Sequence, residues 1–512
     1  MNVVRISLIM LLLVCGSCKP LGAADELYCK NRLSIMAGEN NSITTSSKPE
    51  VTRSLNSSFF SFNLEWVDFQ QDLWDAKRME VKPAVVEWLR PFAGAAYRYP
   101  GGTGSNHLKW TDTVGDINMR PVRPRVDWLG PIAPYFGFDE YLEFVDKVGG
   151  QPWIVLNIYG DYGREIDSAV LSKEAADWAR YAAKRAEEGR PKVLRWELGN
   201  ELDRGRTLWP PGKYTKISDH VSSAVREAIP KATFVAMLQD WPAQKALTTP
   251  EYNRQVMTGL AKRVNEYAHH FYYEEARWNS VMNRMELACQ SINNAKKSGI
   301  RQPTLWITEH ARGTPGERGA DWKRHWPKTA NLEAALITAE AYIAATQFPE
   351  IQGLFLHSLG TTHGPWPLFN STKTQSIHPS AVYWGLRVLR DSMLPNVLVS
   401  RTYSRNNEKS IGDHDVRATI LTDETFQKYV VWSVNRYGLS TKLSVNIPAL
   451  AGRNGSTRFT FIADSNKEAN NYASSDRVSP QTQVSTLTFN ADGIAVIELP
   501  PYSVSSLQIN LQ

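Results

Sequence analysis

Two carboxylates, Glu201 and Glu309, stand where short apolar runs of the sequence end. Glu201 follows Gly199, which allows the chain to turn sharply, and Glu309 follows a run that begins at Leu305. Glycoside hydrolysis typically requires two carboxyl groups that face each other. One donates a proton, and the other acts as nucleophile or base. Glycosidic bond cleavage is therefore the chemistry to test first.

A repeating scaffold is needed to bring the two carboxylates together. From about Phe59 to Leu359, short apolar runs alternate with helical patterns such as Lys173–Glu188 and Leu332–Thr346, which is typical of βα units with a buried parallel sheet. The eight expected strands are Phe59–Trp66, Ala95–Pro100, Trp153–Tyr159, Val193–Leu198, Ala232–Leu238, Glu266–Tyr272, Thr304–Thr308 and Gly353–His357. We therefore expect an α/β fold, a (β/α)8 TIM barrel with its catalytic groups at the carboxyl ends of the strands.

After about Leu394 the pattern changes to short period-two runs separated by polar turns, which indicates a C-terminal antiparallel β-sandwich. The expected strands are Ala418–Leu421, Tyr429–Asn435, Lys442–Ile447, Arg458–Ile462, Val484–Phe489, Ile494–Leu499 and Ser503–Ile509. The expected domains are a signal peptide (1–24), an N-terminal segment that joins the sandwich (25–58), the catalytic barrel (59–393) and the sandwich (394–512).

The amino terminus resembles a secretory signal. Arg5 precedes the apolar stretch Ile6–Val14, and small residues at 22–24 predict cleavage near Ala24, so we expect a secreted or periplasmic protein. Lipidation at Cys18 is the alternative, although Cys15 occupies a position where an aliphatic residue is expected. No later segment reaches the roughly 18 apolar residues of a membrane span.

Cleavage at that point would leave two cysteines in an oxidising compartment. Cys29 and Cys289 form one disulfide or remain two buried free thiols, and both readings stay open.

The composition excludes several classes of protein. The chain has 512 residues, of which 42% are hydrophobic, so an extended or disordered protein is excluded. The net charge of +6 is too mild to indicate nucleic-acid binding. Seventeen Trp and twenty Tyr suit a sugar-binding cleft, although large cores also use aromatic residues. The expected partner is an oligo- or polysaccharide substrate, with no cofactor and no nucleic acid.

Four motifs carry a family resemblance, and they occur in the family's order: Phe62-Asn63-Leu64-Glu65, Arg98-Tyr99-Pro100-Gly101-Gly102, Phe136-Gly137-Phe138-Asp139-Glu140-Tyr141 and Trp196-Glu197-Leu198-Gly199-Asn200-Glu201. Through them the chain resembles the clan A glycoside hydrolases, most closely the α-L-arabinofuranosidases of glycoside hydrolase family 51. The resemblance implies a retaining enzyme in which Glu201 is the acid/base and Glu309 is the nucleophile.

The resemblance also implies roles in substrate binding. It assigns the hydroxyl next to the anomeric carbon to Asn200, part of the terminal sugar to Glu65, and contact with the nucleophile to Tyr272. The other substrate-binding residues that we expect are His270, Arg98, Asn157 and Trp366. An apolar setting and the nearby charge of Glu309 should raise the pKa of Glu201.

Three alternatives remain open at this stage. The motif from Arg98 to Thr103 and the pair His269-His270 are also similar to the heparanase-type β-glucuronidases of family 79. Basic groups in two loops would suit an anionic substrate; they are Arg120, Arg123, Arg125, Arg312, Arg318, Lys323, Arg324 and Lys328. A non-catalytic carbohydrate-binding protein is the third alternative, which the presence of both carboxylates disfavours. A metal site is not expected, because His269 and His270, as neighbours on a strand, point to opposite faces.

Overall fold

The computed structural model describes residues 35–124, 131–162, 164–204, 207–240, 247–273, 278–313, 322–362, 364–371, 376–405, 407–408 and 413–511. The signal-peptide prediction and Cys29 lie outside these residues. Among the helices within them, none is both long enough and apolar enough to cross a bilayer.

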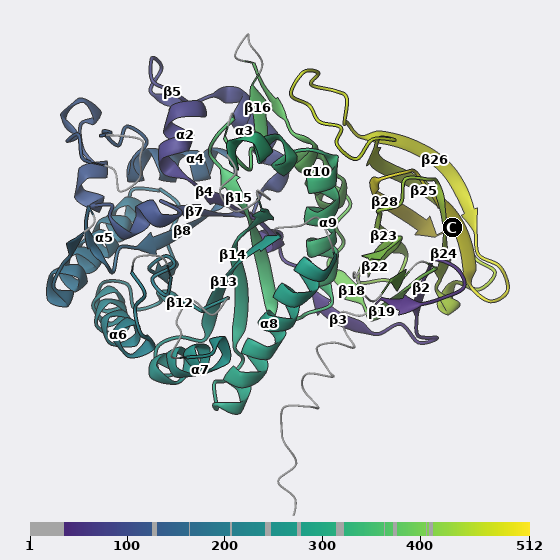
Figure 1. Ribbon diagram of the computed structural model, residues 1–512, viewed down its shortest axis with the longest axis horizontal. Helices are drawn as coiled ribbons and strands as arrows, with labels where there is room; N and C mark the ends of the chain where they lie inside the picture. Colours follow the sequence, from purple (N-terminus) through teal and green to yellow (C-terminus); the bar gives the residue numbers. More distant parts are fainter. Residues whose placement is uncertain are drawn as a thin grey trace, which may run out of the picture.

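Eight parallel strands close into a barrel, which fills the left half of Figure 1. They are β4 (Phe60–Leu64), β7 (Ala96–Tyr99), β8 (Gln151–Leu156), β11 (Arg195–Leu198), β12 (Thr233–Met237), β13 (Glu266–Tyr273), β14 (Thr304–Arg312) and β15 (Ile351–Leu359). Each lies where the sequence predicts a strand, so the expected (β/α)8 barrel is confirmed. The strands are buried on both faces, which explains their continuous apolar runs.

Helices surround the barrel (Figure 1). Their bounds are α2 (Trp66–Asp72), α3 (Pro83–Leu89), α4 (Phe138–Lys147), α5 (Ser168–Glu187), α6 (Pro211–Ala228), α7 (Thr249–Leu260), α8 (Trp278–Lys297), α9 (Leu332–Thr346) and α10 (Ala381–Arg390). Helix α9 has the predicted bounds. Helix α5 begins five residues earlier than predicted, where the Asp167 side chain accepts a hydrogen bond from the Ala169 N–H and caps the helix.

Two further sheets pack beside the barrel and form the right half of Figure 1. The seven predicted strands are present as β22 (Val416–Thr422), β23 (Lys428–Asn435), β24 (Thr441–Asn446), β25 (Asn454–Ala463), β26 (Gln481–Thr488), β27 (Ile494–Leu499) and β28 (Ser503–Leu511). Five short strands complete the sheets: β1 (Met36–Ala37), β2 (Ser42–Thr45), β3 (Val51–Ser54), β18 (Asn396–Leu398) and β19 (Ser400–Ser404). The sheet orders are β1-β19-β2-β24-β27 and β26-β25-β28-β23-β22-β18-β3.

Four two-stranded antiparallel sheets lie outside the barrel and the two larger sheets. They are β5 (Trp74–Asp75) with β6 (Glu80–Val81), β9 (Gly160–Asp161) with β10 (Arg164–Glu165), β16 (Phe369–Ser371) with β17 (Ile377–Pro379), and β20 (Asn407–Glu408) with β21 (Asp413–His414).

Helix α9 lies between the barrel and the second module, and it contacts β14, β15, β22, β23 and β28. Its Glu340 is fully buried and lies against three basic side chains of that module. Arg436 Nη1 approaches Glu340 Oε2 to 2.9 Å, Arg417 Nε approaches Oε1 to 3.6 Å, and His414 hydrogen-bonds to Oε1. The junction between the two modules therefore contains a buried ionic cluster.

The interior of the barrel is filled by aromatic rings. Trp153 packs edge-to-face on Trp306 and Phe355, with ring centroids 5.1 and 4.8 Å apart. The indole Nε1 of Trp153 also donates to Glu197 Oε2 at 2.7 Å. This packed aromatic layer lies below the polar side chains at the carboxyl ends of the strands and contacts them through Glu197.

Candidate active site

The chain turns sharply after β11, as predicted, and the turn carries Glu201 onto the rim of the barrel. Gly199 has φ +78°, and a Cβ there would lie 2.8 Å from Leu202 and 2.9 Å from Ile158. Glu201 itself has φ +49°, an uncommon conformation for a residue with a side chain. Its side chain is 25% exposed, whereas that of Glu309 is 4% exposed.

Strand register brings the other polar groups to the same level. Asn63 on β4 pairs with Arg98 on β7, and His357 on β15 pairs with Asn63. On the two strands that precede β15 in the barrel order, His270 on β13 pairs with Glu309 on β14. Residues far apart in sequence thus meet at one depth, as the sequence predicts for strand ends of a parallel barrel.

Glu201 and Glu309 are close neighbours across His270. One carboxylate oxygen of each and one ring nitrogen of His270 lie within 4.8 Å of one another. The Nδ1 atom of His270 is 2.8 Å from Glu201 Oε1 and 3.5 Å from Glu309 Oε2. So short a separation between carboxylate oxygens fits the retaining geometry, in which the carboxyl groups are about 5–5.5 Å apart, better than the inverting one at roughly 6.5–9.5 Å.

Arg98 lies beneath the site and not on its surface, contrary to the prediction that it binds substrate. Its side chain is fully buried, and its five N–H groups match five acceptor contacts. These are Glu197 Oε2 (2.8 Å), Glu197 Oε1 (3.0 Å), Asn63 Oδ1 (2.7 Å), Glu309 Oε1 (2.8 Å) and Asn200 Oδ1 (2.7 Å). Arg98 therefore orients four residues on or just after three strands, β4, β11 and β14, and has no donor left for a sugar.

Glu309 is held in its ionised form. Burial alone would raise its pKa, but His270, His357 and Arg98 outweigh burial and lower the pKa of Glu309 to about 2. Tyr272 adds a hydrogen bond from its hydroxyl to Glu309 Oε2 at 2.7 Å, the contact that the sequence assigns to this residue. An ionised, buried and oriented carboxylate is suited to attack at carbon.

Glu201 departs from the expectation of a raised pKa. Burial and Glu309 do raise it, but Arg204 and the hydrogen-bonded His270 prevail, so that the pKa of Glu201 lies below its ordinary value. Arg204 Nη1 lies 3.4 Å from Glu201 Oε1, and Asp203 and Asp240 hold the guanidinium in place. The expected rise rested on the charge of Glu309, whereas Arg204 and His270 decide the direction of the shift.

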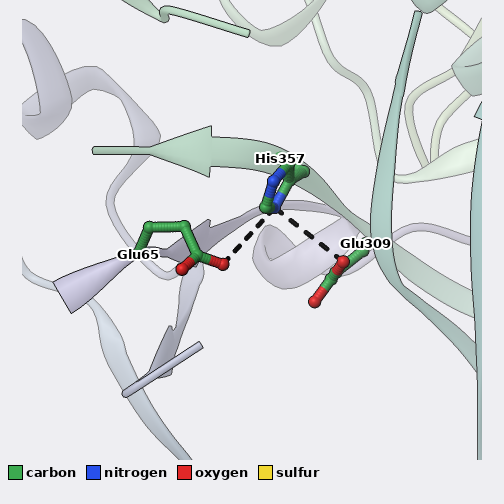
Figure 2. Close-up of side chains that lie close together, drawn as sticks. All are labelled: Glu65, Glu309 and His357. Atoms are coloured by element: carbon green, nitrogen blue, oxygen red, sulfur yellow. Dashed lines mark ion pairs between the residues drawn. The ribbon is translucent and has the colours of Figure 1, made fainter. Parts of the chain in front are cut away.

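Three side chains border the site opposite Glu201. Figure 2 shows His357 between Glu65 and Glu309, with its Nδ1 3.9 Å from a carboxylate oxygen of each. The Trp366 ring lies 4.8 Å from the His357 ring and 5.4 Å from the Tyr272 ring, and its Nε1 donates to the Arg312 carbonyl at 2.7 Å. Glu65 and Trp366 thus lie close to the groups that surround Glu309, and their predicted role in substrate binding stays a prediction.

Asn200 and Asn157, the two asparagines predicted to bind substrate, differ in their side-chain hydrogen-bond partners. Arg98 occupies Asn200 Oδ1, which leaves the amide nitrogen of Asn200 as its donor, and Asn106 exchanges two hydrogen bonds with the Asn200 main chain. Asn157 instead accepts from the N–H groups of Tyr159 and Gly160 and donates to the Gly160 carbonyl. Asn157 therefore stabilises its own loop, and its predicted role in substrate binding stays a prediction.

Two trios of side chains approach closely enough to share a cation: Glu65, Glu309 and His357, and Glu201, His270 and Glu309. Both include Glu309, whose Oε1 and Oε2 already accept from Arg98 and Tyr272. The buried Arg98 charge, 2.8 Å from Glu309, also disfavours a second cation there. His269 and His270 do point to opposite faces, since His269 Nε2 contacts Ser291 Oγ at 3.1 Å.

The basic groups near the site are largely engaged within the protein. Arg120 pairs with Glu140 at 2.8 Å, Arg123 pairs with Asp112 at 2.9 Å, and Arg312 pairs with Glu333 at 2.6 Å. These three arginines are therefore not available to an anionic substrate in the way the sequence suggested. Arg125, Arg318 and the side chains of Lys323 and Arg324 lie outside the described residues.

Cys289 on α8 is disulfide-bonded. Because Cys29 lies outside the described residues, the pairing of these two cysteines stays a prediction.

The sequence predicts no role in the site for six residues that the structure places there. They are Asn63, Asn106, Glu197, Arg204, Thr308 and His357. Glu197 carried a usable signal, because a carboxylate in the middle of a buried strand requires a buried donor such as Arg98. The others depend on contacts between strands or after turns that no local pattern reveals.

Comparison with known proteins adds to this geometry. Residues 88–286 match the family model described as the alpha-L-arabinofuranosidase 1 domain. The resemblance to the α-L-arabinofuranosidases is confirmed. An intracellular exo-alpha-(1->5)-L-arabinofuranosidase of Streptomyces lividans is 31% identical over 203 residues, which cover 37% of this chain and 30% of that protein. The chain thus spans less than a third of the length of that relative.

Solved structures extend the likeness to nearly the whole chain. The α-L-arabinofuranosidase of Thermotoga maritima, in complex with arabinose, covers 92% of this chain and 100% of its own, with a TM-score of 0.76 and 16% identity. The thermostable family 51 α-L-arabinofuranosidase of Thermotoga petrophila gives the same coverage, with a TM-score of 0.73 and 17% identity. At this identity the likeness shows a shared fold, a barrel with an accessory β-module.

Proposed function

We propose that this protein is a retaining glycosidase that removes terminal α-L-arabinofuranosyl groups from oligo- or polysaccharides. The observation that carries the proposal is the close approach of Glu201 and Glu309, whose nearest oxygens share a 4.8 Å cluster with His270. The match to the arabinofuranosidase family model supports the choice of sugar.

The geometry supports a double displacement. The buried, ionised Glu309 attacks the anomeric carbon while Glu201 protonates the departing oxygen. In the second step Glu201 takes a proton from water, the water attacks the same carbon, and Glu309 leaves as a carboxylate. The Asn200 amide nitrogen, fixed by Arg98, is a neutral donor for the hydroxyl beside that carbon.

A screen of aryl glycosides tests both the class and the sugar. We expect turnover of 4-nitrophenyl α-L-arabinofuranoside and little turnover of the β-D-glucuronide or the β-D-xyloside. Proton NMR of the first product should show the α-anomer of L-arabinofuranose. A β-anomer would refute retention, and preference for the glucuronide would favour the heparanase-type alternative. Binding of arabinosides without turnover of any of the three would favour a carbohydrate-binding protein.

We also propose that the chain is exported and loses residues 1–24. The disulfide at Cys289 supports this proposal, because disulfides persist in oxidising compartments. Mass spectrometry of the protein from its native host should show a chain that begins at Asp25. A chain that retains Met1, or one that carries lipid on Cys18, would contradict the proposal.

A further inference from the structure

A chain of hydrogen bonds runs from Glu197 through Thr308 and His270 to Glu201. The buried Glu197 carboxylate accepts from Arg98 Nε and Trp153 Nε1 on Oε2, and from Arg98 Nη2 and Thr308 Oγ1 on Oε1, at 2.7 to 3.1 Å. An ionised carboxylate only accepts hydrogen bonds. The single hydroxyl proton of Thr308 is therefore directed at Glu197.

This arrangement determines the tautomer of His270. Thr308 Oγ1 lies 3.1 Å from His270 Nε2, and because its proton is already used, the oxygen accepts and Nε2 carries a hydrogen. The other ring nitrogen, Nδ1, faces Glu201 Oε1 at 2.8 Å. That contact is a hydrogen bond only if Nδ1 and Glu201 share one proton.

We propose that His270 is a positioning residue that stores the proton which Glu201 delivers to the leaving group, and that Thr308 fixes the ring for this task. The inference rests on the proposed function. A β-bulge makes it possible: Ile307 pairs with His269 and Glu309 pairs with His270, so Thr308 is an extra residue. The neighbouring side chains of Thr308 and Glu309 consequently both reach the polar cluster.

The shared proton can reside on His270 Nδ1 or on Glu201 Oε1, and the total charge of the pair is the same in both cases. In the free protein His270 holds it: burial alone lowers the pKa of His270, but Glu309 and Glu201 raise it above its ordinary value. A bound sugar displaces water, and loss of water favours the neutral pair over the charged pair. The Nδ1 proton then passes to Glu201, which gives it to the leaving oxygen as the glycosidic bond breaks. Water returns the proton through Glu201 in the second step.

Among the described residues, the charged groups around His270 come from five strands or strand ends. The ionisable groups that face it or act on its charge are Glu201 and Arg204 after β11, Glu309 on β14, Arg98 on β7, His357 on β15 and its neighbour His269. Asp240, after β12, is held by Arg204 and Arg284. Of the two carboxylates near Nδ1, Glu201 Oε1 is the closer at 2.8 Å, and Glu309 Oε2 lies at 3.5 Å.

Thr308→Val tests the inference through the pH profile. Without the hydroxyl, neutral His270 can move its hydrogen to Nδ1 and donate to the Glu201 carboxylate, so the pair loses the shared proton more readily. We expect the alkaline limb of kcat/KM for an alkyl arabinofuranoside to fall by about one pH unit, which is a tenfold change in proton affinity. Thr308→Ser should restore the wild-type limb. An aryl substrate with an acidic phenol should respond much less.

Thr346→Val is the matched control, because Thr346 is a buried threonine at the junction of α9 with the second module. Its alkaline limb should not move. An unmoved limb in Thr308→Val, or an equal loss at every pH and for every leaving group, would overturn the inference. Histidine 15N NMR, with the His270 signal assigned through His270→Gln, tests the tautomer without any substrate. A hydrogen on Nδ1 alone, at any pH, would refute the inference even if the protein hydrolyses another glycoside or none.

Discussion

Arg98→Lys separates the charge of Arg98 from its hydrogen-bonding geometry. The guanidinium satisfies five acceptor contacts on Glu197, Asn63, Glu309 and Asn200, whereas a lysine ammonium has three N–H groups on one atom. At least two buried acceptor contacts are then lost. Each unsatisfied buried group costs about 1–3 kcal/mol, so the free energy of unfolding should fall by about 2–6 kcal/mol.

The same substitution should impair catalysis. A charge-assisted hydrogen bond contributes about 1.5–3 kcal/mol. If Arg98 no longer donates to Glu309 and the activation barrier rises by that amount, kcat/KM should decrease by about 10- to 100-fold. Urea unfolding followed by tryptophan fluorescence, together with arabinofuranoside kinetics, measures both effects.

Arg123→Lys is the control for Arg98→Lys, because Arg123 is 41% exposed and pairs with Asp112 near the surface. Its free energy of unfolding should change by less than about 1 kcal/mol. If Arg98→Lys unfolds at the wild-type urea concentration and keeps full turnover, the assignment of Arg98 as the organiser of the site is wrong.

Three further predictions concern other groups. Glu309→Gln should abolish turnover and covalent trapping, whereas Glu201→Ala should spare substrates with acidic phenols and yield a glycosyl azide of retained configuration when azide is added; equal loss on all substrates would contradict these roles. Tyr272→Phe should lower kcat by about tenfold and leave the fold intact, as checked by circular dichroism. Burial raises the pKa of Glu340, but His414 and Arg436 lower it to about 2. The ionised Glu340 therefore contributes its full share to the free energy of unfolding above pH 4.5, and this contribution is lost as the pH falls towards 2. Glu340→Gln should therefore cost about 3–5 kcal/mol at pH 7 and less at pH 3, measured by urea unfolding.

The barrel strands and the two carboxylates could be predicted because their signals are local. A strand buried on both faces is largely apolar, and a carboxylate near the carboxyl end of such a strand, as Glu309 is in β14, or just past it, as Glu201 is after β11, lies near the rim. The sign of the Glu201 pKa shift could not be predicted in this way. Glu201 adopts a positive φ, and Arg204, three residues later, approaches its carboxylate. The charge that decides the pKa thus depends on a turn geometry that composition does not encode.

The bulge in β14 shows why part of the site is hidden from pattern analysis. Strict alternation would point Thr308 and Glu309 to opposite faces, and one of them would then miss the barrel interior. The register shift against β13 adds one residue, so that Thr308 contacts Glu197 and His270 while Glu309 contacts Arg98. A nucleophile and the group that orients the proton carrier can therefore be neighbours in sequence. Substitutions that remove the bulge should disturb both steps of the reaction together, whereas Thr308→Val should disturb only the steps that need the shared proton.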